Sequence, residues 1–186
     1  MHPTPSLVSK SSLRSLGGAK LINLREFLSN QSTKDMASHK SVGTKLKDGS
    51  KDKFYHFFKF TVYLLPDICP DIVKSIKLID GTTSWEASTG SHKAIVFHSH
   101  LVHGATIEVK DTVKEVTDSS RTIIYKIDEY IMENGGIGDI TGVKLEVAPD
   151  DLATWTVYYD KTNPDEYLDL LKSVSEAVDN YISTQN

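Results

Sequence analysis

The sequence predicts an α+β domain in which one long helix packs on an antiparallel sheet of six or seven strands. Three observations lead to this prediction. Short segments of alternating apolar and polar residues follow one another through the second half of the chain. Two helix-like segments interrupted by prolines precede most of these segments, and a strongly amphipathic helical pattern closes the chain.

The strand pattern recurs at short intervals, with connections short enough for hairpins. The clearest case lies near the C-terminus, where Ala153, Trp155, Val157 and Tyr159 share one face and threonines occupy much of the other. We expect strands over Ser41–Lys47, Val73–Ile79, Ala94–His100, Ala105–Val116, Thr122–Ile127, Gly142–Val147 and Leu152–Tyr159.

Helical spacing first appears after Ser50, a residue type that favours N-caps. Phe54, Phe57, Phe58 and Val62 fall on one side of this helix. Two prolines, at positions 66 and 70, disfavour helical geometry in the residues before them. We therefore expect two short helices rather than one long one.

The C-terminal helix has the strongest signals in the sequence. Asn163 suits the N-cap and Pro164 the first helical position, and the pattern runs to about Ser183. A helix of about 20 residues spans about 30 Å, enough to cross a curved sheet from edge to edge. Its apolar stripe consists of Leu168, Leu171, Val174, Val178, Tyr181 and Ile182.

Composition and charge exclude several classes of protein. The 186 residues are 39% hydrophobic and 25% charged, which is ordinary for a globular domain. Cys69 is the only cysteine, so a disulfide scaffold and a zinc ribbon are excluded. No stretch approaches the roughly 20 apolar residues of a membrane span. Residues 36–186 carry 16 basic and 23 acidic residues, a net charge of −7, which argues against a nucleic-acid partner.

Residues 1–35 differ from the rest of the chain. They are rich in Ser and Leu and carry five basic residues against two acidic ones, a net charge of +3. This composition fits a transit peptide, but also a disordered tail, a helix packed on the domain, or sequence upstream of a true start at Met36. We expect an N-terminal extension over residues 1–35 and a ligand-binding domain over 36–186. The expected location is the cytoplasm, or a plastid if the extension is a transit peptide.

Four stretches, Asp52–Lys59, Leu65–Asp71, Lys74–Gly81 and Trp155–Lys161, occur in an order and spacing that resemble the major latex protein branch of the Bet v 1 (birch pollen allergen) superfamily. The resemblance implies a helix-grip fold: a curved seven-stranded antiparallel sheet wrapped around the long C-terminal helix, with two short helices in a V. It also implies a cavity that binds a hydrophobic small molecule such as a plant hormone, sterol or flavonoid, in defence or stress responses. A monomer without a cofactor is expected.

A strongly curved sheet and a straight helix cannot touch along their whole length. The space between them is either filled by large side chains or left as a cavity, and ligand cavities measure about 300 to 1,000 Å³. From the residues alone both outcomes stay open; the resemblance favours the cavity. The expected ligand contacts are Phe54, Phe58, Ile76, Leu78, Tyr125, Val143, Leu145, Trp155, Val157, Tyr159, Leu171, Val174 and Val178.

The loop that contains Gly81 and Gly90 departs from the family pattern. The family usually has a further glycine in the middle, whereas here eight residues, 82–89, separate the two. A glycine loop can bind phosphate through backbone N–H groups. Because the middle glycine is missing, we do not carry phosphate binding over to this chain.

Four histidines, His92, His98, His100 and His103, lie close together in sequence. Residues two apart on a strand share a face, so a shared metal is conceivable. No acid or cysteine stands nearby to complete a ligand set. We expect ordinary imidazoles and no metal site.

Some relatives implied by the resemblance catalyse condensation or isomerisation in alkaloid pathways. The candidate acid and base groups here are Lys126, Tyr125, Asp128, Glu129 and Tyr159. Tyr125 and Lys126 are adjacent on a strand and face opposite sides, so we expect Lys126 in water. We therefore expect a binding protein and no enzyme. A ligand-dependent receptor that contacts a protein partner is the other alternative.

Overall fold

The computed structural model describes residues 38–99, 104–133, 138–161 and 163–185. The described residues belong to one compact unit, Ala37–Asn186. The extension expected over residues 1–35 lies outside the described residues, so the fold is that of this unit.

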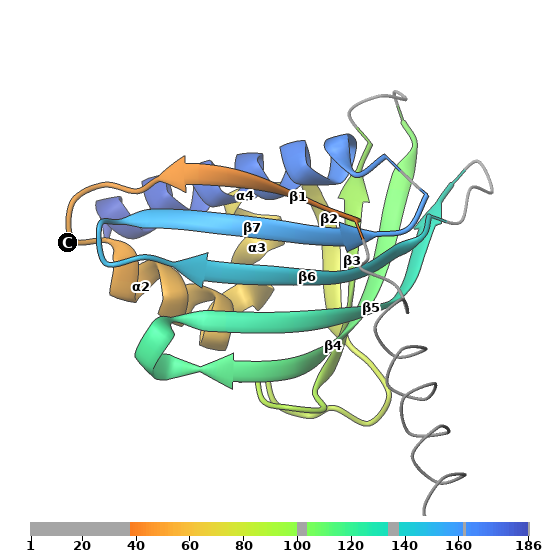
Figure 1. Ribbon diagram of the computed structural model, residues 1–186, viewed down its shortest axis with the longest axis horizontal. Helices are drawn as coiled ribbons and strands as arrows, with labels where there is room; N and C mark the ends of the chain where they lie inside the picture. Colours follow the sequence, from red (N-terminus) through yellow and green to blue (C-terminus); the bar gives the residue numbers. More distant parts are fainter. Residues whose placement is uncertain (1–37, 100–103, 134–137, 162, 186) are drawn as a thin grey trace, which may run out of the picture. The chain divides into compact units, whose positions relative to one another are not determined.

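One sheet of seven antiparallel strands forms this unit, in the order β1-β7-β6-β5-β4-β3-β2 (Figure 1). β1 and β2 follow each other along the chain but lie at opposite edges, so the helices between them cross the sheet. The predicted seven-stranded antiparallel sheet is confirmed. The strands are β1 (Ser38–Lys45), β2 (Val73–Leu78), β3 (His92–His98), β4 (Thr106–Thr117), β5 (Thr122–Met132), β6 (Ile140–Val147) and β7 (Leu152–Tyr159).

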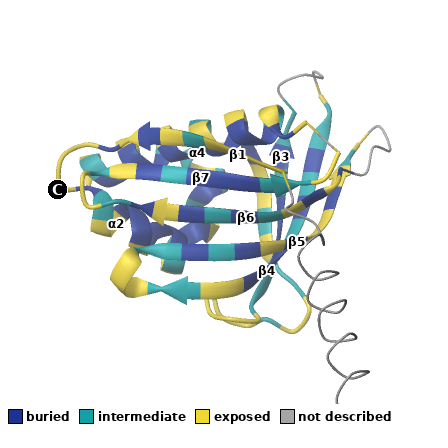
Figure 2. Cartoon of the chain, viewed as in Figure 1, coloured by how far each residue is buried: buried dark blue, intermediate teal, exposed yellow. Residues whose placement is uncertain are grey.

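The sheet buries one face along most of its strands. In β5 the side chains of Ile123, Tyr125 and Ile127 are buried, whereas Lys126 between them is exposed. Figure 2 shows this alternation of buried and exposed residues along the strands. Register shifts between β4 and β5, at 110–111 and 113–115, mark bulges. Bulges bend and twist a strand pair, which helps to curve the sheet around its buried face.

The short helices are joined by irregular turns. α2 (Lys51–His56) continues into a π-helical turn, Phe57–Thr61, then a 3₁₀ turn, Val62–Leu64, and then α3 (Leu65–Ile68). Pro66 lies in the first turn of α3, where the missing backbone N–H costs nothing. The proline is therefore accommodated as the second residue of this helix.

The long helix α4 (Asp165–Thr184) packs on the buried face of the sheet (Figure 1). It begins one residue later than expected, at Asp165, whose backbone N–H donates to the Oδ1 of Asn163 over 3.3 Å. Its side chains Leu168, Leu171, Val174, Val178 and Ile182 are buried. Among the described residues, no helix is long and apolar enough to cross a membrane.

Candidate functional site

A cavity of about 40 Å³ lies between the inner face of the sheet, α4 and the irregular helical segment, residues 51–68. Most of the side chains around it are apolar. The lining residues are Phe58, Val62, Leu65, Lys93, Ile95, Phe97, Asp111, Tyr125, Ile127, Val143, Trp155, Tyr167, Leu171 and Val174.

This cavity is much smaller than the 300 to 1,000 Å³ expected from the resemblance. It has room for about three waters, whereas a benzene-binding cavity measures about 150 Å³. The chain's own rings take up the space: Phe58 and Trp155 pack edge to face with centroids 5.1 Å apart, and Phe97 and Tyr167 do so at 6.0 Å. The expectation of a large void is therefore corrected, because aromatic side chains fill most of the interior.

A second cavity, of about 20 Å³, adjoins the first. The two have Phe58, Val62 and Lys93 in common, so these side chains form the wall between them. The loop between β2 and β3 covers the second cavity. It is fastened to the helical segment where the Ala87 N–H donates to the carbonyl oxygen of Lys59 over 2.7 Å.

A buried ion pair interrupts the apolar wall of the first cavity. The Nζ of Lys93 on β3 donates to the Oδ1 of Asp111 on β4 over 2.6 Å, and the two side chains are 11% and 6% exposed. The ammonium also lies 4.0 Å from the centroid of the Tyr125 ring, within the range of a cation–π contact. Burial raises the pKa of Asp111, and the attraction of Lys93 opposes that rise.

Two tyrosine hydroxyls accompany this pair. Tyr125 and Tyr167 line the cavity, and burial, followed by the charge of Asp111, holds the pKa of each phenol well above 10.0. Both hydroxyls are therefore protonated and able to donate. Within the described part of the chain neither hydroxyl has a side-chain or backbone partner within hydrogen-bonding distance.

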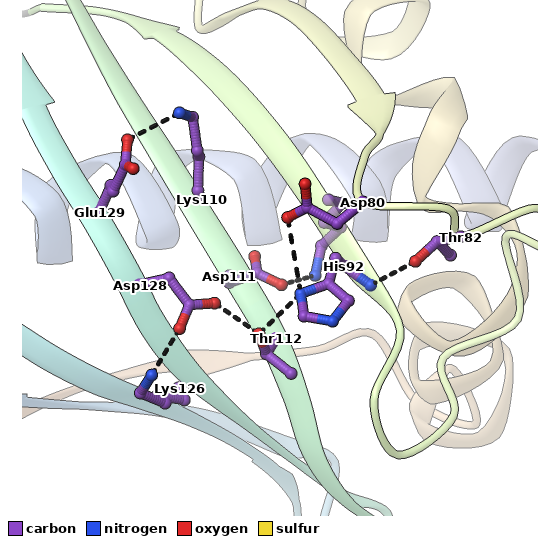
Figure 3. Close-up of polar contacts among 10 residues, drawn as sticks. Asp80, Thr82, His92, Lys110, Asp111, Thr112, Lys126, Asp128 and Glu129 are labelled. Atoms are coloured by element: carbon purple, nitrogen blue, oxygen red, sulfur yellow. Dashed lines mark hydrogen bonds and ion pairs between the residues drawn. The ribbon is translucent and has the colours of Figure 1, made fainter.

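The outer face of the sheet carries a separate polar cluster (Figure 3). Lys126 donates to Asp128 over 2.6 Å, and the hydroxyl of Thr112 contacts both Asp128 and, at 2.9 Å, the Nδ1 of His92. Partial burial opposes ionisation of Asp128, but the hydrogen bonds from Lys126 and Thr112 outweigh it and lower the pKa. Figure 3 also shows Lys110 paired with Glu129, at 2.7 Å.

The structure separates the expected ligand contacts into groups. The first cavity is lined by Phe58, Tyr125, Val143, Trp155, Leu171 and Val174. Leu78 lines the second cavity. Phe54, Leu145, Val157 and Val178 are buried in the core without lining either cavity, and Ile76 and Tyr159 are half-buried against it.

The loop glycines and the histidines lie elsewhere. Gly81 and Gly90 have φ values of 77° and 89° in the loop between β2 and β3, a conformation that favours glycine. His92 and His98 lie at the two ends of β3, while His100 and His103 fall outside the described residues. Among the residues that are described, no three His, Cys, Asp or Glu side chains are placed to hold a metal ion.

Sequence reasoning missed the buried ion pair. In β4 the residues Ile107, Val109, Asp111 and Val113 alternate, which places a carboxylate on the apolar face. Lys93 stands two residues before Ile95 on the same face of β3. The signal available in the sequence was therefore a charged residue at a position where the strand alternation predicts an apolar, inward-facing one. The other lining residues that were missed are Val62, Leu65, Ile95, Phe97, Ile127 and Tyr167.

Comparison with known proteins agrees with this geometry. A model of the pathogenesis-related protein Bet v 1 family matches residues 37–185, which confirms the resemblance found in the sequence. Major latex-like protein 151 from ginseng, Panax ginseng, superimposes with a TM-score of 0.66 at 19% identity, covering 79% of this chain and 98% of that one. At 19% identity this match shows a shared fold.

Two further solved structures have the same fold. Ara h 8.0201 gives a TM-score of 0.51 at 13% identity, covering 80% of this chain and 98% of that one. Truncated norcoclaurine synthase from Thalictrum flavum gives 0.50 at 13% identity, covering 78% and 92%. At such identities these likenesses establish the fold alone.

Proposed function

This chain belongs to the pathogenesis-related protein Bet v 1 family, known for binding hydrophobic ligands, and on that premise we propose that it binds a hydrophobic small molecule between its sheet and α4. The observation that carries the proposal is the mostly apolar cavity at this place in the fold. Burial of an apolar ligand there is favourable by about 25 cal/mol per Å². A plant hormone, sterol, flavonoid or similar metabolite, acting in defence or stress responses, is the proposed range of ligands.

Binding requires the interior to open, because about 40 Å³ does not hold even one aromatic ring. Phe58 stands between the two cavities, so rotation of its side chain joins them. Phe58 belongs to the π-helical turn Phe57–Thr61. π-Helical turns are rare overall, but those that occur are often at functional sites. The presence of one here supports the proposal that this helical segment rearranges around a ligand.

We favour binding over catalysis. Of the acid and base candidates from the sequence, Tyr125 lines the cavity, whereas Lys126, Asp128 and Glu129 lie in ion pairs on the outer face. Tyr159 lines neither cavity. This arrangement offers no acid and base pair from that set around a bound molecule. An alkaloid-type condensation or isomerisation is the alternative, tested by incubation with an amine and an aldehyde followed by mass spectrometry.

The proposal also covers partners and location. We propose a cytoplasmic monomer without a cofactor or nucleic-acid partner. The net charge of −7 over residues 36–186 supports the exclusion of nucleic acid. A ligand-dependent protein partner is tested by a pull-down with and without ligand.

The test is titration of the full chain with the neutral fluorescent probe N-phenyl-1-naphthylamine. We expect saturable binding at one probe per chain with a blue-shifted emission. Val143→Phe adds a ring at the cavity wall and should weaken binding at least tenfold, whereas Ile131→Phe, at a residue 37% exposed, should not. Circular dichroism checks that both variants fold. Absence of saturable binding, or full binding by Val143→Phe, would overturn the proposal.

A further inference from the structure

The Lys93–Asp111 pair is not explained by stability. The two charges lie in a wall that is otherwise made of apolar and aromatic side chains, and both side chains are almost fully buried. Withdrawing two charges from water costs about as much as their attraction returns, and apolar replacements of similar volume are often as stable or more stable. A role in recognising a ligand accounts for the position of this pair on the cavity wall.

The pair and its neighbours have unused hydrogen-bonding capacity. Asp111 accepts from Lys93 through Oδ1, which leaves Oδ2 as an acceptor. The hydroxyls of Tyr125 and Tyr167, which have no partner in the described part of the chain, are donors. The cavity therefore offers one hydrogen-bond acceptor, on Asp111, and two donors, on Tyr125 and Tyr167. The charge of Asp111 helps to hold the pKa of both tyrosines above the usual value.

The charge balance of this group favours a neutral ligand. Lys93 and Asp111 neutralise each other, and among the residues that the structure describes no other Lys, Arg, Asp or Glu lines the first cavity. A carboxylate or ammonium on the ligand would bring a second, uncompensated charge into a buried site, which is costly. A neutral polar group adds no such charge.

A hydroxyl group on the ligand can pair with both the available acceptor and the available donors. It donates one hydrogen bond, here to Asp111 Oδ2, and accepts another, here from Tyr125 or from a remaining N–H of Lys93. A carbonyl oxygen only accepts and leaves the carboxylate oxygen unpaired. We infer that Lys93 and Asp111 form the polar end of the binding site and select a neutral, largely apolar molecule that carries an alcohol or phenol hydroxyl. This inference rests on the proposed function and specifies the ligand class of that site.

Three probes with the same ring system test the inference: naphthalene, 2-naphthol and 2-naphthoate, measured by displacement of N-phenyl-1-naphthylamine from the full chain. We expect 2-naphthol to bind about tenfold more tightly than naphthalene, as a hydrogen bond to a charged group predicts. The charged 2-naphthoate should bind no better than naphthalene. Equal binding of naphthol and naphthalene, or tightest binding of naphthoate, would refute the hydroxyl anchor while leaving the proposed function intact.

Paired variants locate the effect. Lys93→Met/Asp111→Leu removes both charges without leaving one alone, and should keep naphthalene binding while abolishing the preference for naphthol. The control Lys126→Met/Asp128→Leu removes the outer-face pair with the same 2.6 Å separation and should keep the preference. If the inner double variant does not fold, Tyr125→Phe removes only a hydroxyl and should still reduce the preference severalfold. A preference unchanged by these inner variants contradicts the inference, whereas a wild-type chain that binds no probe contradicts the proposed function itself.

Discussion

The indole Nε1 of Trp155 donates a 2.8 Å hydrogen bond to the Oγ of Ser175, and this bond joins β7 to α4 inside the domain. The Ser175 hydroxyl, fully buried, donates in turn to the carbonyl oxygen of Leu171 over 2.9 Å. The Trp155 ring also packs edge to face on Phe58. The sheet, the long helix and the irregular helical segment therefore meet at one ring on the cavity wall.

Ser175→Ala should lower the free energy of unfolding by about 1 to 3 kcal/mol, because the buried indole N–H loses its partner. The better helix propensity of alanine offsets only a few tenths of that loss. Urea denaturation measures the change. Ser183→Ala, which removes a hydroxyl bonded to the Asp179 carbonyl on the half-buried side of the same helix, should cost much less. Equal stability of the two variants would show that the indole bond contributes nothing.

Phe58→Ala should separate stability from binding. Removal of a buried phenylalanine side chain costs about 3 to 5 kcal/mol, yet here it also removes one of the three side chains that the two cavities share and so enlarges the space between them. We expect a lower free energy of unfolding together with tighter binding of N-phenyl-1-naphthylamine. Phe54→Ala removes a fully buried ring from the same helical segment, at a residue that lines neither cavity. It should destabilise without a comparable gain in affinity, and a similar gain would argue against Phe58 as the barrier.

The sequence predicts the fold well wherever its two-residue or helical period is unbroken. The bounds of β7, Leu152–Tyr159, agree with the prediction because its alternation has no interruption. β5 extends to Met132, five residues past the predicted end at Ile127. In the pairing of β4 with β5, Lys110 lies opposite Glu129 and the next residue, Asp111, lies opposite Ile127. Asp128 is therefore an extra residue that breaks the two-residue period. A bulge of this kind hides the continuation of a strand.

The site is less predictable, for two physical reasons. The contact of Lys93 with Asp111 depends on the register of β3 against β4, which places residues 18 apart in sequence on one wall. The size of the cavity depends on how individual rings pack, as with Trp155 against Phe58. Periodicity identifies which residues face inward, but it contains no information on how much space their side chains leave.

Asp118→Asn should weaken the link between α2 and the turn Asp118–Ser120. Two groups donate to the Asp118 carboxylate, the Nζ of Lys59 over 2.8 Å and the hydroxyl of Tyr55 over 2.7 Å, and these bonds lower the pKa of Asp118. A lowered pKa contributes stability above the unfolded value of 3.8, which is lost as the pH falls through the folded value. The variant should be less stable at pH 7, and the difference should shrink near pH 3.

Thermal unfolding at the two pH values measures this effect. Asp71→Asn, at an exposed aspartate whose side chain makes no hydrogen bond or ion pair with the described part of the chain, is the matched control and should follow the wild type at both. A difference between Asp118→Asn and wild type that stays constant with pH would contradict the assigned role of the carboxylate.

The buried Asp111 should act on stability in the opposite direction. Burial, opposed by Lys93, raises its pKa above the unfolded value of 3.8, so the folded chain binds a proton more readily than the unfolded chain. This contribution is fully present below pH 3.8 and is lost as the pH rises through the folded pKa. Lys93→Met/Asp111→Leu removes both titrating groups and should equal or exceed the wild type in stability at pH 7. Its advantage should decrease as the pH falls from 7 to 4.

Urea unfolding at pH 7, 6, 5 and 4 measures this trend. The outer-face variant Lys126→Met/Asp128→Leu should show the reverse slope, because the pKa of Asp128 is lowered and its contribution is lost in acid. The two double variants remove pairs with the same 2.6 Å separation, so opposite slopes isolate the effect of burial on the carboxylate. Parallel slopes would mean that Asp111 is solvated like Asp128, and the ion pair would then not be a buried feature of the cavity wall.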